Sequence, residues 1–133
     1  MFHRVFPAAF AALQLACGSG APASVSILAP AEQDSTARDV LVRLGVAGAR
    51  AVAADGRHVE GEGHHHLFLD VDPSPLGQPI PKGDAIFHLG SGADTLRLTG
   101  LAPDPHRLIA VFASGDHVPM PAIRLDTVHF IVR

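Results

Sequence analysis

The stretch Val40–Ala47, with the sequence VLVRLGVA, places a large aliphatic side chain at every second position. Successive side chains of an extended strand point to opposite faces, so this alternation is typical of a β-strand with one face in a hydrophobic core. The aliphatic residues on that face are Val40, Val42, Leu44 and Val46. The pattern therefore predicts a half-buried strand.

Short apolar segments of the same kind recur along the chain, separated by Gly, Pro and Asp and without a helical period. The expected strands are Val25–Leu28, Val40–Ala47, His65–Val71, Ala85–Leu89, Thr95–Leu98, Arg107–Ala113 and Thr127–Val132. About seven strands at this spacing indicate an all-β fold, an immunoglobulin-like antiparallel β-sandwich. Four prolines between positions 73 and 81 exclude a central strand there and favour a stiff loop, which we expect to cross between the sheets.

The composition fits one globular domain. The chain has 133 residues, of which 47% are hydrophobic and 17% are charged, which is enough apolar material for a packed core. Its formal net charge is -3, and its Lys and Arg residues are scattered. Because a nucleic-acid-binding protein needs a basic face, the sequence gives no indication of a nucleic-acid partner.

The first 23 residues predict an export signal. Met1–Arg4 is a short basic start, Val5–Ala16 is an apolar run of signal-peptide length, and small residues follow. The apolar run is too short to cross a bilayer as a helix. We therefore expect a signal with its linker over 1–23 and a single β-sandwich domain over 24–133.

Two processing routes remain open. Leu13–Cys17 resembles a bacterial lipobox, although Gln14 stands where leucine is preferred, and this route would lipidate Cys17 and anchor the protein at the outer membrane. The alternative is cleavage after Ala23, which would give a periplasmic or secreted protein. Cys17 is the only cysteine of the chain, so the mature domain has no internal disulfide, thiolate metal site or cysteine nucleophile.

Three consecutive histidines are the candidate functional residues. In an extended strand His64 and His66 share one face with Phe68, whereas His65 lies on the opposite face with Leu67. The side chains of alternate strand residues start about 7 Å apart, so two imidazoles at this spacing can reach one ion. This pair is the natural chelate.

A third donor for a metal site would come from His117 or His88, and His117 is the better candidate. His117 lies in a Gly, Asp and Pro-rich turn that would fix its side chain, and His88 ends another apolar segment. Neutral histidine is the commonest nitrogen ligand of zinc and copper, and a thioether from Met120 would favour copper. The sequence therefore predicts a copper or zinc site from His64, His66, His117, His88 and Met120.

A metal-free interpretation remains open. The same histidines can form a hydrogen-bonded cluster that braces loops of a structural or protein-interaction module with an envelope partner. We expect His65 to be a buried imidazole hydrogen-bonded to the backbone rather than a ligand. Three other histidines, His58, His106 and His129, are expected to be structural or on the surface.

The sequence contains no established catalytic motif. It has no serine-centred elbow, no Gly-rich phosphate loop and no His-Glu-x-x-His helix. Asp70 and Asp72 share a face at strand spacing, but the proline that follows makes a strand-ending turn the simpler explanation. A hydrolytic or redox enzyme would need a metal with an open coordination position.

Several motifs, in order, carry a resemblance to a known family. They are Gly61–Asp70 with the triple histidine, Leu76–Pro81, His88–Gly90, His106 and Asp116–Pro119. On these motifs the chain resembles the domain-of-unknown-function 4399 family of bacterial secreted proteins and lipoproteins. The resemblance implies a fold and an extracytoplasmic setting, and no reaction, because the activity of the family is not established.

The resemblance spans roughly Val25 to Val132 and includes two departures. The family usually has His-x-His-Phe-Gly where this chain has Ile86–Gly90, with one histidine fewer. It also usually has a second histidine after the His-x-Pro element, where this chain has Met120. Two potential ligands of the family are thus altered here.

Overall fold

The structure is a computed structural model that describes residues 20–133. The expected signal segment up to residue 19, with Cys17, lies outside the described residues. The described chain contains strands, turns and loops and no helix. No helix among these residues is therefore long and apolar enough to cross a membrane.

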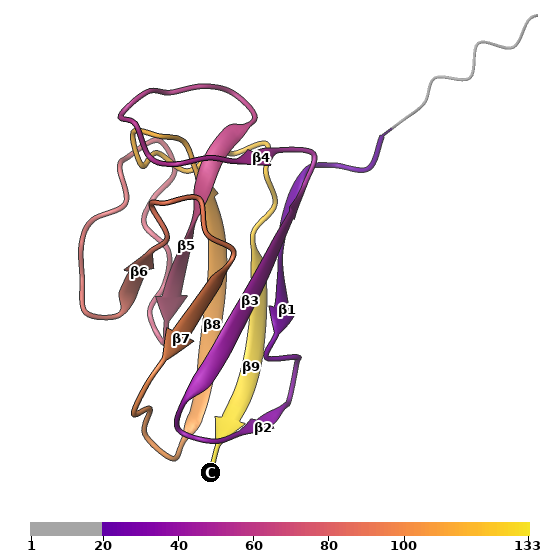
Figure 1. The fold of residues 1–133 in the computed structure, drawn as a ribbon, viewed down its shortest axis with the longest axis vertical. Helices are drawn as coiled ribbons and strands as arrows, with labels where there is room; N and C mark the ends of the chain where they lie inside the picture. Colours follow the sequence, from indigo (N-terminus) through magenta and orange to yellow (C-terminus); the bar gives the residue numbers. More distant parts are fainter. Residues whose placement is uncertain (1–19) are drawn as a thin grey trace, which may run out of the picture.

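Two β-sheets pack face to face, which confirms the expected all-β sandwich (Figure 1). The small sheet has the order β1-β3-β7, and the large sheet has the order β2-β9-β8-β5-β4 with β6 also paired to β5. The strands of the small sheet are β1 (Ser24–Ala29), β3 (Val40–Ala47) and β7 (Thr95–Leu98). Those of the large sheet are β2 (Ser35–Thr36), β4 (Arg50–Ala51), β5 (Glu62–Leu69), β6 (Ile86–His88), β8 (Pro105–Ala113) and β9 (Asp126–Val132).

All seven expected strands are present, and two more were not expected. The additional strands β2 and β4 have two residues each and pair in parallel with β9 and β5, whereas the longer strands pair antiparallel. Two residues are too few to show alternation. The strand β5 begins at Glu62, before the expected start, because its first residues pair with β4 and β8.

The hydrophobic core lies between the two sheets. The alternating residues of β3 supply one side of it, with Val42 fully buried, and the large sheet supplies the other with Leu67, Leu108, Phe112 and Phe130, each at most 1% exposed. Burying side chains of this size contributes about 1.5–3 kcal/mol each. The core therefore buries one face of β5, so the side chains of its other face point away from the core.

The proline-rich connection does not cross between the sheets as expected. It joins β5 to β6, which pair with each other, and so stays with the large sheet. The outer face of this sheet carries Phe68, Ile109 and Val111, and Ile80 of the connection packs against them and is only 7% exposed. Because this loop covers the outer face, β5 is buried on both sides, and the histidines on it are buried as well.

Candidate metal centre

The strand β5 presents its three histidines to two different environments. His65 faces the core beside Leu67, with its ring centroid 5.2 Å from that of Phe112. Burial lowers its pKa, as expected for an imidazole of the core. Its Nδ1 has no hydrogen-bond partner among the described residues, so this nitrogen does not make the expected backbone bond. His64 and His66 lie on the other face and are at most 2% exposed.

The pairing of β6 with β5 brings the third histidine to this face. His88 is the register partner of His66 in the antiparallel ladder, and their rings stack with centroids 4.9 Å apart. Directly opposed residues of two strands project to the same side of the sheet, which is why the two rings meet. The sequence identified His88 as a candidate ligand, and the β5–β6 ladder places it beside His66.

A tight turn after β8 supplies the fourth histidine. His117 has a φ of 67°, in the left-handed region that few residues other than glycine adopt. Its amide donates to the Ser114 carbonyl at 2.8 Å, and its carbonyl accepts from the Ile80 amide at 2.9 Å. The turn and the proline-rich connection are thus tied together at the residue that carries the imidazole.

The four imidazoles converge on one point. One ring nitrogen from each of His64, His66, His88 and His117 lies within 4.8 Å of the other three. The Nε2 atoms of His64 and His66 are 2.9 Å apart, and those of His88 and His117 are 3.1 Å apart. Four nitrogens bound tetrahedrally to zinc at about 2.0–2.1 Å are separated by about 3.3 Å. Small side-chain movements would therefore bring all four to one ion.

The environment favours the neutral form of three of these rings. Burial, and then the charges that His88 and His117 would carry, lower the pKa of His64 to about 4. Burial and the neighbouring His64 lower the pKa of His66 to about 3, and burial and His117 lower that of His88. A metal ligand must be deprotonated, so His64, His66 and His88 are in the ligating form at neutral pH without having to lose protons.

The buried pair leaves hydrogen-bonding capacity unused. A contact of 2.9 Å between the Nε2 atoms of His64 and His66 holds one proton, so a metal-free neutral pair has one ring protonated on Nε2 and the other on Nδ1. Both Nδ1 atoms are buried without a hydrogen-bond partner among residues 20–133. One buried N–H and one buried lone pair therefore remain unsatisfied.

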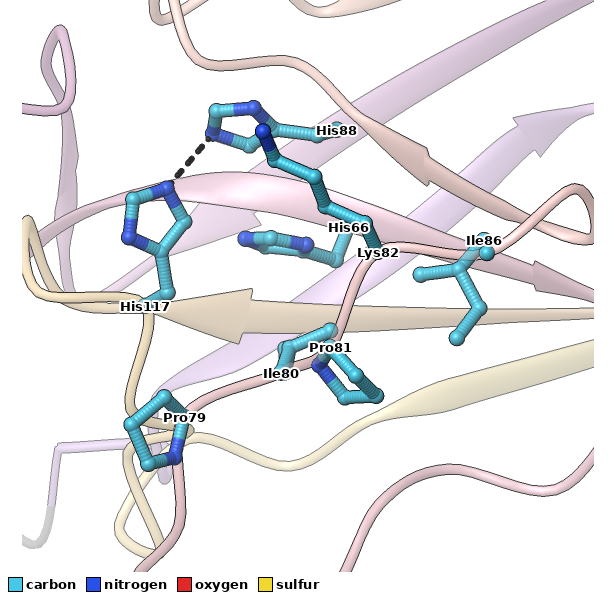
Figure 2. A pocket seen from close by; sticks show the side chains of 9 residues that line it. His66, Pro79, Ile80, Pro81, Lys82, Ile86, His88 and His117 are labelled. Carbon is cyan, nitrogen blue, oxygen red and sulfur yellow. Dashed lines mark hydrogen bonds between the residues drawn. The ribbon is translucent and has the colours of Figure 1, made fainter.

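The cluster forms one wall of a cavity of about 540 Å³. Three of the histidines line it, and His64 does not. The other lining residues are Pro79, Ile80, Pro81, Lys82, Gly83 and Ile86. Figure 2 shows the His66 ring near those of His88 and His117, and the Lys82 side chain running toward His88, whose pKa its charge helps to lower. An ion held by the cluster would therefore have one side on this cavity.

A polar network holds the turn of the fourth histidine, and sequence reasoning missed it. The Ser114 hydroxyl, fully buried, donates to the Asp116 carboxylate, and Nδ1 of His58 lies 3.0 Å from that hydroxyl and 3.1 Å from Asp116. The Ser114 hydrogen bond is the largest cause of the lowered pKa of Asp116. In a catalytic triad the serine and the carboxylate use opposite nitrogens of the histidine, whereas here both contact Nδ1. The network braces the turn.

The remaining candidate residues have structural positions. Met120 is 2% exposed, packs in the core between the sheets and lines a second cavity, not the one that the histidines line. Asp70 directly follows β5, and its carboxylate accepts from the Arg107 amide at 2.8 Å and lies 2.7 Å from Nδ1 of His106. Asp72 pairs with the Arg107 guanidinium. These contacts agree with the strand-ending turn that the sequence indicates.

Comparison with known proteins identifies a family and no characterised relative. The family model described as Domain of unknown function (DUF4399) matches residues 42–133. The match begins within β3, later than the resemblance suggested, and includes all four histidines of the cluster. No curated protein and no solved structure matches the chain.

Proposed function

The chain belongs to the family of domains of unknown function DUF4399, and we propose that it binds one transition-metal ion, zinc or copper(II), in the cell envelope. The ligands are His64, His66, His88 and His117. The observation that carries the proposal is the convergence of four ring nitrogens within 4.8 Å of one another from β5, β6 and the turn after β8.

The energetics favour an ion over a metal-free brace. A brace gains two N–H···N bonds, worth about 1 kcal/mol each, and leaves two buried nitrogens unsatisfied at about 1–3 kcal/mol each. An ion bound to the four Nε2 atoms leaves the Nδ1 protons of His64 and His66 in the same buried positions. It adds a coordination free energy that is about 10–16 kcal/mol for structural zinc in small peptides. Only the ion outweighs the cost of burying the rings.

The donor set bears on the identity of the metal. Four imidazole nitrogens suit both zinc and copper(II). The preference for copper that a thioether would give has no support in the contacts of Met120, which packs with core residues. Zinc and copper(II) are therefore the two ions to test first.

The extracytoplasmic setting is part of the proposal and is supported by the sequence. The basic start, the apolar run and the small residues after it are typical of an exported protein. The only cysteine, Cys17, lies in that leader, so the domain over 24–133 does not depend on disulfides in an oxidising compartment. Capture, buffering or delivery of a metal ion in the envelope fits both features.

A thermal melt with and without ions tests the function. Metal-free protein is melted alone and with Zn(II) or Cu(II) at about a hundred times the dissociation constant, where binding to the native state adds about 2.7 kcal/mol. We expect the rise in Tm to disappear in the His64→Leu, His66→Leu double variant. It should persist in the matched control His129→Leu, because His129 is 60% exposed on β9.

The outcomes separate the two interpretations. A shift that depends on the buried pair and not on His129 supports the site. If neither ion shifts Tm, or if the control loses the shift as well, the cluster is not the binding site. A brace would in addition make the double variant much less stable than the wild type without any ion.

A further inference from the structure

A divalent ion bound in the candidate metal centre would carry an uncompensated positive charge. All four of its donors are neutral imidazoles, so a divalent ion would retain its full charge in a half-buried site. No carboxylate is among the residues that line the adjoining cavity. Lys82, which does line it, adds a further positive charge.

The position of Lys82 is distinctive because it is the only lysine of the chain. It follows the proline-rich segment that covers the large sheet, and Figure 2 shows its side chain extending over the cavity toward His88. No carboxylate among the described residues lies within salt-bridge distance of its ammonium group. The ammonium group is therefore available to an anion that enters the cavity.

The remaining wall of the cavity is apolar. Pro79, Pro81 and Ile86 supply apolar side chains to the lining, and Ile80 anchors this wall to the sheet beneath it. A volume of about 540 Å³ lies within the range of about 300–1,000 Å³ that small-molecule sites occupy. Such a cavity fits a molecule with one anionic end and a short hydrocarbon body better than it fits an inorganic ion.

We propose that this cavity binds a small organic carboxylate, with its carboxylate between the metal ion and Lys82 and its hydrocarbon part against Pro79, Pro81 and Ile86. The inference rests on the proposed metal site. The carboxylate oxygen becomes a fifth ligand of the ion on the cavity side, and its charge offsets that of the ion and the ammonium group. His66, His88 and His117 face this position, and His64 holds the ion from the buried side.

The test begins with metal loading and then adds the carboxylate. Protein is loaded with one equivalent of Cu(II) or Co(II), and retention of the ion is measured for the wild type, Lys82→Gln and Lys82→Arg. Each loaded protein is then titrated with 3-methylbutanoate while the visible absorption of the ion is followed. We expect a saturable change in wild type, binding weakened about three- to tenfold in Lys82→Gln, and binding largely restored in Lys82→Arg.

Other titrants test the two ends of the ligand separately. Each buried carbon of the hydrocarbon part tightens binding about fourfold, so acetate should bind at least about tenfold more weakly than 3-methylbutanoate. The uncharged 3-methylbutanamide should leave the spectrum unchanged. Inorganic phosphate should also bind more weakly, since it has no hydrocarbon part.

The outcomes distinguish this inference from the function on which it rests. If no variant retains the ion, the metal site itself is refuted and the carboxylate site with it. If all variants retain the ion but the carboxylate leaves the spectrum unchanged, or binds Lys82→Gln within twofold of wild type, only the carboxylate site is refuted. Binding of acetate or phosphate as tight as that of 3-methylbutanoate would refute the role of the apolar wall.

Discussion

Acidification should destabilise the metal-free protein through its two buried histidines. His64 and His66 have pKa values of about 4 and about 3 in the native state, below the ordinary value near 6.5, chiefly because they are buried. Between pH 6.5 and 4 the unfolded chain therefore binds protons that the native protein excludes. The free energy of unfolding consequently falls as the pH falls through this window.

The size of the effect at pH 5 depends little on the native pKa values, because both lie below 5. Each histidine lowers the free energy of unfolding by about 2 kcal/mol at pH 5 relative to pH 8, and the pair lowers it by about 4 kcal/mol. A small domain has a total of about 5–15 kcal/mol. The pair therefore accounts for a large share of the acid sensitivity of the protein.

Urea titrations at pH 8 and pH 5, with a chelator present, measure this effect. The wild type is compared with the His64→Leu, His66→Leu double variant, which retains the other titrating groups and so isolates the pair. We expect the variant to lose about 4 kcal/mol less than the wild type over this range. At pH 8 it should be at least as stable, because apolar side chains replace imidazoles with unsatisfied nitrogens. Equal losses in the two proteins would refute the buried neutral pair.

Three further predictions concern the support of the site and the packing of the sheet. Asp116→Ala removes the carboxylate that accepts the Ser114 hydrogen bond in the turn carrying His117, so metal affinity measured against a competing chelator should fall about ten- to a hundredfold. Unchanged affinity would show that this network does not position His117 as a ligand. Gly63→Ala places a Cβ 2.2 Å from a backbone oxygen of β8 and should lower the free energy of unfolding by about 3 kcal/mol or more. In the control Gly45→Ala the nearest neighbour of the added Cβ is 3.5 Å away, so the free energy of unfolding should change by less than about 1 kcal/mol. Equal losses in the two variants would contradict the close approach at Gly63. Burial alone would lower the pKa of His106, but its hydrogen bonds, including that to Asp70, raise it. The stability that the protonated His106 contributes is complete below pH 6.5 and is lost as the pH rises through the raised pKa, so Asp70→Asn should cost more stability at pH 5 than at pH 9 by denaturant titration. A cost that is larger at pH 9 would contradict the assignment.

The sandwich could be predicted from the sequence because several strands show an alternating apolar pattern within their own segments. The alternation in Val40–Ala47 and in Thr95–Leu98 coincides with the bounds of β3 and β7. The two-residue strands β2 and β4 could not be predicted, since they exist only through parallel pairing with β9 and β5. The predicted path of the proline-rich connection was wrong, because proline content predicts a stiff loop and does not predict which sheet face the loop covers.

All four histidines of the cluster were candidate ligands from the sequence, but only two of them could be placed on one face. The period of two places His64 and His66 on one face without knowledge of the fold. His88 and His117 were alternatives for a third donor, and the structure brings both to the cluster. The β5–β6 register places His88 there, and the left-handed turn after β8 places His117. Such registers depend on long-range packing. No local pattern indicates that His58 reaches the same turn from 56 positions away.

X-ray absorption at the edge of the bound metal tests the central claim most directly. Protein loaded with one equivalent of zinc or copper(II) should show four imidazole nitrogens at about 2.0–2.1 Å, with any oxygen ligand from the cavity in addition. In the His64→Leu, His66→Leu variant, that imidazole signal should be absent. A shell of oxygen atoms with fewer than three imidazoles, or the same spectrum from the double variant, would contradict a metal centre built by His64, His66, His88 and His117.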